Sequence, residues 1–63
     1  MSIVIASYHD PYGYRATIRM NNRGRHELII STSGKTVFKG DYASRASARN
    51  AMNRFCDIWT LEK

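Results

Sequence analysis

The stretch Tyr42-Ala-Ser-Arg-Ala-Ser-Ala-Arg-Asn-Ala-Met-Asn-Arg-Phe-Cys-Asp-Ile-Trp59 decides the fold, because it is the one segment with the apolar period of a helix. Ser44 suits the N-cap, where its hydroxyl can accept a backbone N–H one turn on. The pattern predicts a helix over about residues 44–59. At 100° per residue one apolar stripe collects Ala48, Ala51, Met52, Phe55, Ile58 and Trp59.

A single helix cannot bury such a stripe alone, so the preceding residues must form a sheet. The clearest strand is 14–20, where Tyr14 and its alternate neighbours Ala16, Ile18 and Met20 share one face. Further strands are predicted at about 2–8, 26–32 and 35–39, with Leu28 and Ile30 pointing inward. Three short connections make neighbouring strands antiparallel. Residues 1–63 are therefore predicted to form one α+β domain, a three- or four-stranded antiparallel meander with one C-terminal helix on one face (ββββα).

Length and composition narrow the class of protein. Sixty-three residues support only a small core, and a single cysteine, Cys56, excludes an internal disulfide. The sequence has no Cys/His cluster that would indicate a zinc site, and no motif that would indicate a cofactor. Without a disulfide or a metal, a domain this small can gain stability by forming a homodimer. No apolar run is long enough for a membrane span, and the first residues lack the basic start of a signal peptide. We therefore expect a cytoplasmic protein.

The helix carries a family resemblance. Tyr42-x-Ser44-Arg45-Ala46-x-Ala48-x-Asn50-x-Met52 resembles the signature Tyr-x-Ser-Lys-Ala-x-Ala-x-Asn-x-Ile of the YegP-like family of small domains of unknown function. Gly13-Tyr14-Arg15 and the Asn22-x-Gly24 turn resemble that family's first hairpin, whereas the Ser33-Gly34 turn departs from it. The resemblance implies a fold but no function. Because the family often carries the unit in tandem, a single copy here implies a homodimer.

A second, looser resemblance concerns the junction between sheet and helix. Gly40-x-Tyr42 followed by Ala46, Ala48 and Ala51 is similar to the junction in plant Apetala-type DNA-binding domains. The arm-binding domains of tyrosine integrases share the plan of a three-stranded sheet plus a helix. In both, the sheet face away from the helix enters the major groove, so this resemblance implies DNA binding.

The charge agrees with an anionic partner, since ten Lys and Arg stand against five Asp and Glu, a net charge of +5. Residues 15–25 hold several of the arginines and no acid. Such a strand face can enter the major groove, where Arg bonds guanine, although a solvated sheet face also needs polar residues. We predict a nucleic-acid site, with DNA more plausible than RNA, at Arg15, Thr17, Arg19, Arg23 and Arg25. Arg45 and Arg49 form a secondary basic patch, for which two solubilising side chains are the plainer interpretation.

The alternative is a protein-binding modulator or inhibitor, a phage-type accessory protein that docks on the acidic surface of a larger partner. An exposed sheet edge could add a strand to that partner. Residues for a protein or homodimer interface are Tyr12, Ile29 and Trp59. We predict no enzyme activity, because neither histidines, carboxylates nor the cysteine form a catalytic pattern, and no glycine-rich phosphate loop exists.

Overall fold

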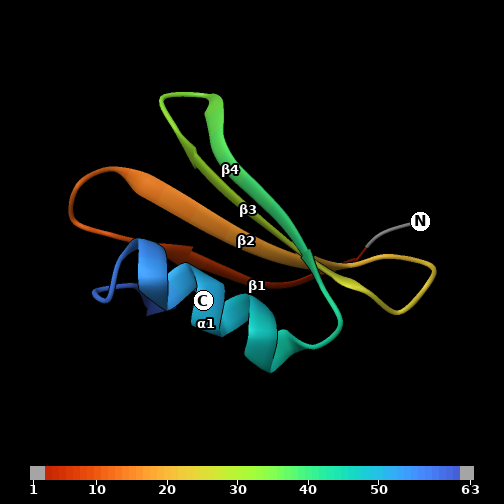
Figure 1. Ribbon diagram of the computed structural model, residues 1–63. Helices are drawn as coiled ribbons and strands as arrows, with labels where there is room; N and C mark the ends of the chain where they lie inside the picture. Colours follow the sequence, from red (N-terminus) through yellow and green to blue (C-terminus); the bar gives the residue numbers. More distant parts are fainter. Residues whose placement is uncertain (1–2, 62–63) are drawn as a thin grey trace.

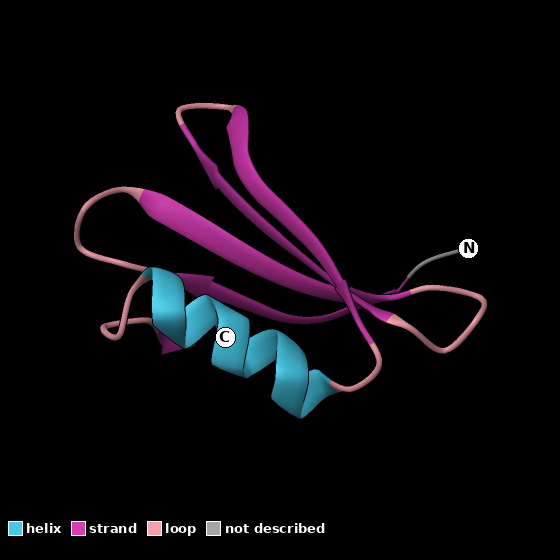
Figure 2. Ribbon diagram, viewed as in Figure 1, coloured by secondary structure: helices cyan, strands magenta, loops and turns pink. Residues whose placement is uncertain are grey.

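A computed structural model describes residues 3–61 as an α+β fold, an antiparallel sheet of five strands with one helix on one face (Figures 1 and 2). The strands lie in the order β4-β3-β2-β1-β5. The α+β class and the antiparallel meander are confirmed, but the helix is not the last element. In chain order the elements are β1 (Ile3–His9), β2 (Tyr14–Met20), β3 (His26–Thr32), β4 (Lys35–Tyr42), α1 (Arg45–Phe55) and β5 (Thr60–Leu61).

Two turns of the same design build the first two hairpins. Asp10 Oδ1 accepts the backbone N–H groups of Tyr12 at 3.0 Å and Tyr14 at 2.8 Å. Asn21 Oδ1 likewise accepts those of Arg23 at 2.9 Å and Arg25 at 3.1 Å. Asp and Asn favour turns because their side chains can bond the backbone in this way.

A glycine at positive φ completes both turns. Gly13 has φ +94° and Gly24 has φ +76°, a region that residues with a Cβ rarely adopt. The third turn uses two residues at positive φ, Ser33 at 51° and Gly34 at 79°, which is typical of a two-residue hairpin. The three short turns explain why β1 to β4 run antiparallel.

The core lies between the sheet and α1, as the alternation of β2 and β3 predicts. The side chains in the middle of β2 and β3 that point toward α1 are buried, whereas those on the opposite face stay partly or fully exposed. The helix contributes Ala48 and Met52, and it crosses β2, β3 and β4. The buried apolar residues are Ala6, Tyr8, Ala16, Ile18, Leu28, Ile30, Ala48 and Met52.

The helix begins where predicted but ends early. Ser44 is the N-cap, and its Oγ accepts the N–H of Ser47 at 3.1 Å. The predicted end at residue 59 is wrong, because α1 stops at Phe55 and β5 pairs with Tyr8 and His9 of β1. Leaving the helix lets the chain lay Trp59 against the core.

Two donors meet at the carboxyl end of α1. The Met52 carbonyl accepts the backbone N–H of Cys56 at 3.0 Å and Nε1–H of Trp59 at 2.8 Å. Carbonyl groups in the last turn of a helix need such outside partners. The Trp59 bond therefore ties the C-terminal segment to the helix it has just left.

The predicted bounds of the outer strands also change. The first strand was predicted over 2–8, but Ser2 lies outside the described residues and β1 continues to His9. The fourth strand was predicted to end at residue 39, yet β4 continues to Tyr42. The Tyr42 ring packs over Gly40, where an added Cβ would lie 2.6 Å from its Cε2. Gly40 therefore serves as a close-approach residue inside a strand, and not as the end of one.

Candidate nucleic-acid interface

The sheet face away from α1, here called the outer face, has no other element over it in residues 3–61 (Figure 1). The strand register arranges its side chains in rows that cross β1, β2, β3 and β4. The first row is His9, Arg15, Ser31 and Thr36; the middle row is Ser7, Thr17, Ile29 and Lys39; the third row is Val4, Arg19, Glu27 and Asp41.

The third row is electrically balanced. Arg19 Nη2 lies 3.7 Å from Glu27 Oε1, its direct neighbour on β3. Arg25, which precedes β3, donates from Nε to Asp41 Oδ1 at 2.9 Å. Two arginines thus face two carboxylates here, for a net charge of zero. The run without acids in residues 15–25 does not become an acid-free surface, because β3 and β4 bring acids beside it.

The first and middle rows hold no acid. Their cations are Arg15 and Lys39, and both are exposed. The remaining members, apart from Ile29, are hydroxyl side chains and His9, so each can donate a hydrogen bond to a phosphate or a base. This end of the outer face is therefore the part that suits an anionic partner.

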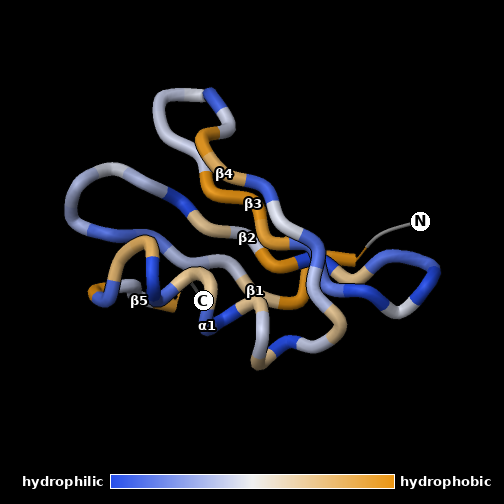
Figure 3. The backbone as a smooth tube through the Cα atoms, viewed as in Figure 1, coloured by the Kyte–Doolittle hydropathy of each residue, from blue (hydrophilic) through white to orange (hydrophobic). Residues whose placement is uncertain are grey.

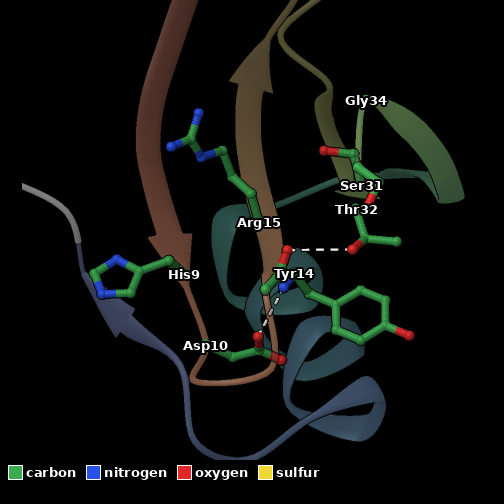
Figure 4. A pocket seen from close by; sticks show the side chains of 9 residues that line it. His9, Asp10, Tyr14, Arg15, Ser31, Thr32 and Gly34 are labelled. Carbon is green, nitrogen blue, oxygen red and sulfur yellow. Dashed lines mark hydrogen bonds between the residues drawn. The ribbon is translucent and has the colours of Figure 1, made fainter.

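An open hollow of about 400 Å³ adjoins the first row, between the β1–β2 turn and the β3–β4 turn. Figure 4 shows Arg15 between His9 and Ser31, which come from the two neighbouring strands. The Thr32 hydroxyl at the end of β3 donates to the Gly13 carbonyl at 3.2 Å, and this bond holds the β1–β2 turn against β3 beside the hollow. The hollow gives the first row a concave border beside the turns.

The predicted nucleic-acid residues are brought together except at the turn. Arg15, Thr17 and Arg19 follow one another along the outer face of β2. Arg23 is exposed in the β2–β3 turn, which Figure 3 colours hydrophilic over most of its length. Arg25 lies beside the third row, paired with Asp41. Three of the five thus share a strand face, and the other two lie at its turn end.

The secondary basic patch belongs to the other layer. Arg45 and Arg49 are exposed on α1, one turn apart, and the sheet separates them from the outer face. Arg54 near the carboxyl end brings the helix to three arginines without an acid. A flat ligand bound to the outer face therefore cannot also contact these arginines.

The residues predicted for a protein interface do not form one surface. Tyr12 is 74% exposed in the β1–β2 turn. Ile29 is half-buried in the middle row of the outer face. Trp59 packs on the opposite side, against the core, with its ring 6.4 Å from that of Phe55. An interface using Ile29 would leave Trp59 untouched.

Sequence reasoning missed Lys39, His9 and Ser31 as members of the rows, and Glu27 and Asp41 as partners of the arginines. A signal was present in the short turns, since a hairpin turn fixes which residues lie opposite each other. It also missed exposed apolar residues in the outer parts of the sheet. These include Ile3 and Val4 at the start of β1, before the residues that pair with β5, and Val37 and Phe38 on the edge strand β4.

Groups for metal or catalytic chemistry are dispersed. Within residues 3–61 no three His, Cys, Asp or Glu side chains gather closely enough to hold a metal ion. His9 pairs with Arg15 on the outer face, whereas His26 pairs with Met20 on the helix side. The only helix of this described part, α1, is too short and too polar to cross a bilayer.

Comparison with known proteins adds no identity: no family model, curated protein or solved structure matches this chain.

Proposed function

We propose that this protein is a small cytoplasmic accessory protein that binds duplex DNA through the outer face of its sheet. One observation carries the proposal. The first and middle rows of the outer face hold two exposed cations and five side chains able to donate hydrogen bonds, with no acid in either row and no element of residues 3–61 over them. Duplex DNA offers phosphates and base edges that accept such bonds.

The dimensions of the sheet suit the major groove. Neighbouring strands lie about 4.8 Å apart, so a row across four strands spans about 14 Å. The major groove of B-form DNA is about 12 Å wide and admits a two-stranded ribbon. The central strands β2 and β3 would face the bases, and Lys39 on β4 would meet a phosphate. RNA fits less well, because the major groove of A-form RNA is too narrow and deep for side chains to read.

We assign different roles to the predicted arginines according to their places on the sheet. Arg15 is exposed on β2, one of the two central strands that would face the bases, so we assign it to base contacts. Arg23, in the exposed turn, is assigned to phosphate contacts at the sheet end. Arg19 and Arg25 already face Glu27 and Asp41, which weakens their attraction to DNA.

Fluorescence anisotropy with a labelled 24-base-pair duplex, titrated between 50 and 200 mM salt, tests the proposal. We expect binding that weakens steeply with salt, since each neutralised phosphate releases counterions. Arg15→Gln should lower the affinity at every salt concentration. Arg54→Gln is the matched control, because it removes one exposed arginine from the helix layer. Absence of binding at 50 mM salt, or equal losses in both variants, would refute the proposal.

The edge of β4 favours a second candidate function, a protein-binding module. β4 is an edge strand over its whole length, and Val37 and Phe38 on it are 47% and 36% exposed. A partner could add a strand there, as in other cases of β-augmentation. The register shift near Ile30 and the lysines of β4 oppose this, since irregularities and charges protect edges from pairing.

A nuclease-treated pull-down separates the two functions. Recovery of one protein in fixed stoichiometry, lost in Val37→Lys, would favour the protein-binding module. A second copy of the chain as the partner would appear as a dimer in sedimentation at high concentration. Recovery that disappears after nuclease treatment would favour DNA.

A further inference from the structure

We infer that the outer face reads sequence, with Arg15 on a guanine and the pair Thr17–Ile29 on the methyl group of a thymine two base pairs away. This inference rests on the proposed function, because it requires β2 to lie along the major groove. It adds the kind of sequence that the protein prefers.

An apolar centre in an otherwise polar face carries the inference. Thr17 and Ile29 lie directly opposite each other on β2 and β3, in the middle row. Both side chains are only half-buried, although no other element of the described chain covers them. Side chains of directly opposite residues are about 4.5–5.5 Å apart at Cβ, so the Thr17 methyl and the Ile29 side chain form one small apolar patch.

The major groove has one apolar feature that such a patch can recognise. Thymine carries a C5 methyl group there, whereas the other edges of the base pairs present hydrogen-bond donors and acceptors. The flanking members of the middle row, Ser7 and Lys39, are polar and would face the sugar-phosphate borders. Contact with a thymine methyl would remove the exposed part of the patch from water.

The expected distance between the guanine and the thymine follows from the similar repeats of a strand and of DNA. Alternate residues of a strand are about 6.8 Å apart, and two base-pair steps of B-form DNA rise by about the same distance. Arg15 stands two residues before Thr17 on β2, with Ser31 and His9 beside it in the first row. Arg bonds guanine O6 and N7 in the groove. The expected element is therefore a guanine and a thymine separated by one base pair.

Three duplexes of 24 base pairs test this reading by anisotropy. The duplex d(GAT)8·d(ATC)8 contains guanine and thymine two base pairs apart. Its twin d(GAU)8·d(AUC)8 lacks only the thymine methyl groups. The duplex d(GT)12·d(AC)12 contains both bases but never at that separation. We expect the first duplex to bind about fourfold more tightly than the second, the effect of burying one methyl group, and more tightly than the third.

Two variants connect the effect to the patch. Thr17→Ser and Ile29→Ala should each reduce the difference between the first two duplexes while keeping the salt dependence. Val37→Ala, which trims an exposed apolar residue of the edge strand β4, should keep the full difference. Circular dichroism shows whether each variant is folded, and Thr17→Ser removes too little to disturb the core.

The possible outcomes distinguish failure of this inference from failure of the proposed DNA binding on which it rests. Salt-dependent binding that is equal for the thymine and uracil duplexes would overturn the base reading and leave DNA binding intact. Tighter binding of d(GT)12·d(AC)12 than of d(GAT)8·d(ATC)8 would overturn the spacing. Failure of all three duplexes to bind would refute the proposed function itself.

Discussion

Replacing Asp41 by Asn should make DNA binding stronger and more sensitive to salt. Asp41 accepts a hydrogen bond from Arg25 at 2.9 Å, and both side chains are about half exposed, 55% and 46%. The amide of Asn keeps the size of the side chain but loses its charge. Arg25 is then free to neutralise a phosphate, so one more counterion leaves the DNA on binding.

The magnitude follows from the charges of the interface. Arg23 and Lys39 are the cations assigned to phosphates, so about two phosphates are neutralised and the slope of log K against log salt is about −1.8. Releasing Arg25 raises this to about three phosphates and a slope of about −2.7. Between 50 and 200 mM salt the affinity of Asp41→Asn should then fall about 40-fold, compared with about 12-fold for the unmodified protein.

Anisotropy titrations at four salt concentrations measure both slopes. Asp57→Asn is the matched control, because it removes one exposed carboxylate from the segment between α1 and β5, away from the outer face. An exposed ion pair stabilises a fold by only about 0–1 kcal/mol, so Asp41→Asn should remain folded. The reasoning is refuted if Asp41→Asn leaves the slope unchanged, or if Asp57→Asn steepens it equally.

Substitutions at three further positions test the packing and the helix cap, each by urea unfolding followed with circular dichroism. Met52→Ala removes a side chain that is 1% exposed and should cost about 2–5 kcal/mol, comparable with the whole net stability of a domain of this size; a midpoint close to that of the unmodified protein would contradict this core. Trp59→Phe keeps an aromatic ring but loses the bond to the Met52 carbonyl, so we expect a loss of about 0.5–1.5 kcal/mol, and no loss would mean that this bond does not hold the C-terminal segment. Ser44→Ala should cost about 1 kcal/mol through the lost N-cap, whereas Ser44→Asp should be nearly neutral.

The sheet could be predicted well because its signals are local. The strands at 14–20 and 26–32 have the predicted bounds, since alternation and glycine turns mark both ends. Asp10 and Asn21 hold their turns with side-chain bonds to residues two and four positions on. Nothing distant in the chain is needed to specify these hairpins.

The end of the helix could not be predicted from periodicity. Ile58 and Trp59 continue the apolar stripe in sequence, yet both lie beyond α1. A helical Trp59 would match the pattern equally well. Tertiary contacts decide where the helix ends: the Trp59 indole N–H donates to the Met52 carbonyl, and the following residues pair with β1. The same limit applies to Gly40, whose use depends on the Tyr42 ring above it.

The composition of the candidate site was harder to predict than its location. The alternation of β2 correctly placed Arg15, Thr17 and Arg19 on one face. It did not reveal that Asp41, sixteen residues from Arg25 in the chain, would lie beside it. Charge counted along one strand therefore overestimates the charge of a sheet surface, because every inner strand has two neighbours.

The pairing of strands distributes charge unevenly between the two ends of the outer face. Carboxylates from β3 and β4 balance the end near the β2–β3 turn, whereas the first and middle rows toward the other two turns hold cations and no acid. An anionic ligand is therefore drawn toward Arg15 and away from Arg19, although both belong to the same strand face. If the face binds DNA, the loss caused by Arg→Gln should decrease along β2 from Arg15 to Arg19. Equal losses at the two positions would mean that the Arg19–Glu27 ion pair breaks on binding. The carboxylates near the β2–β3 turn would then not determine where the ligand binds.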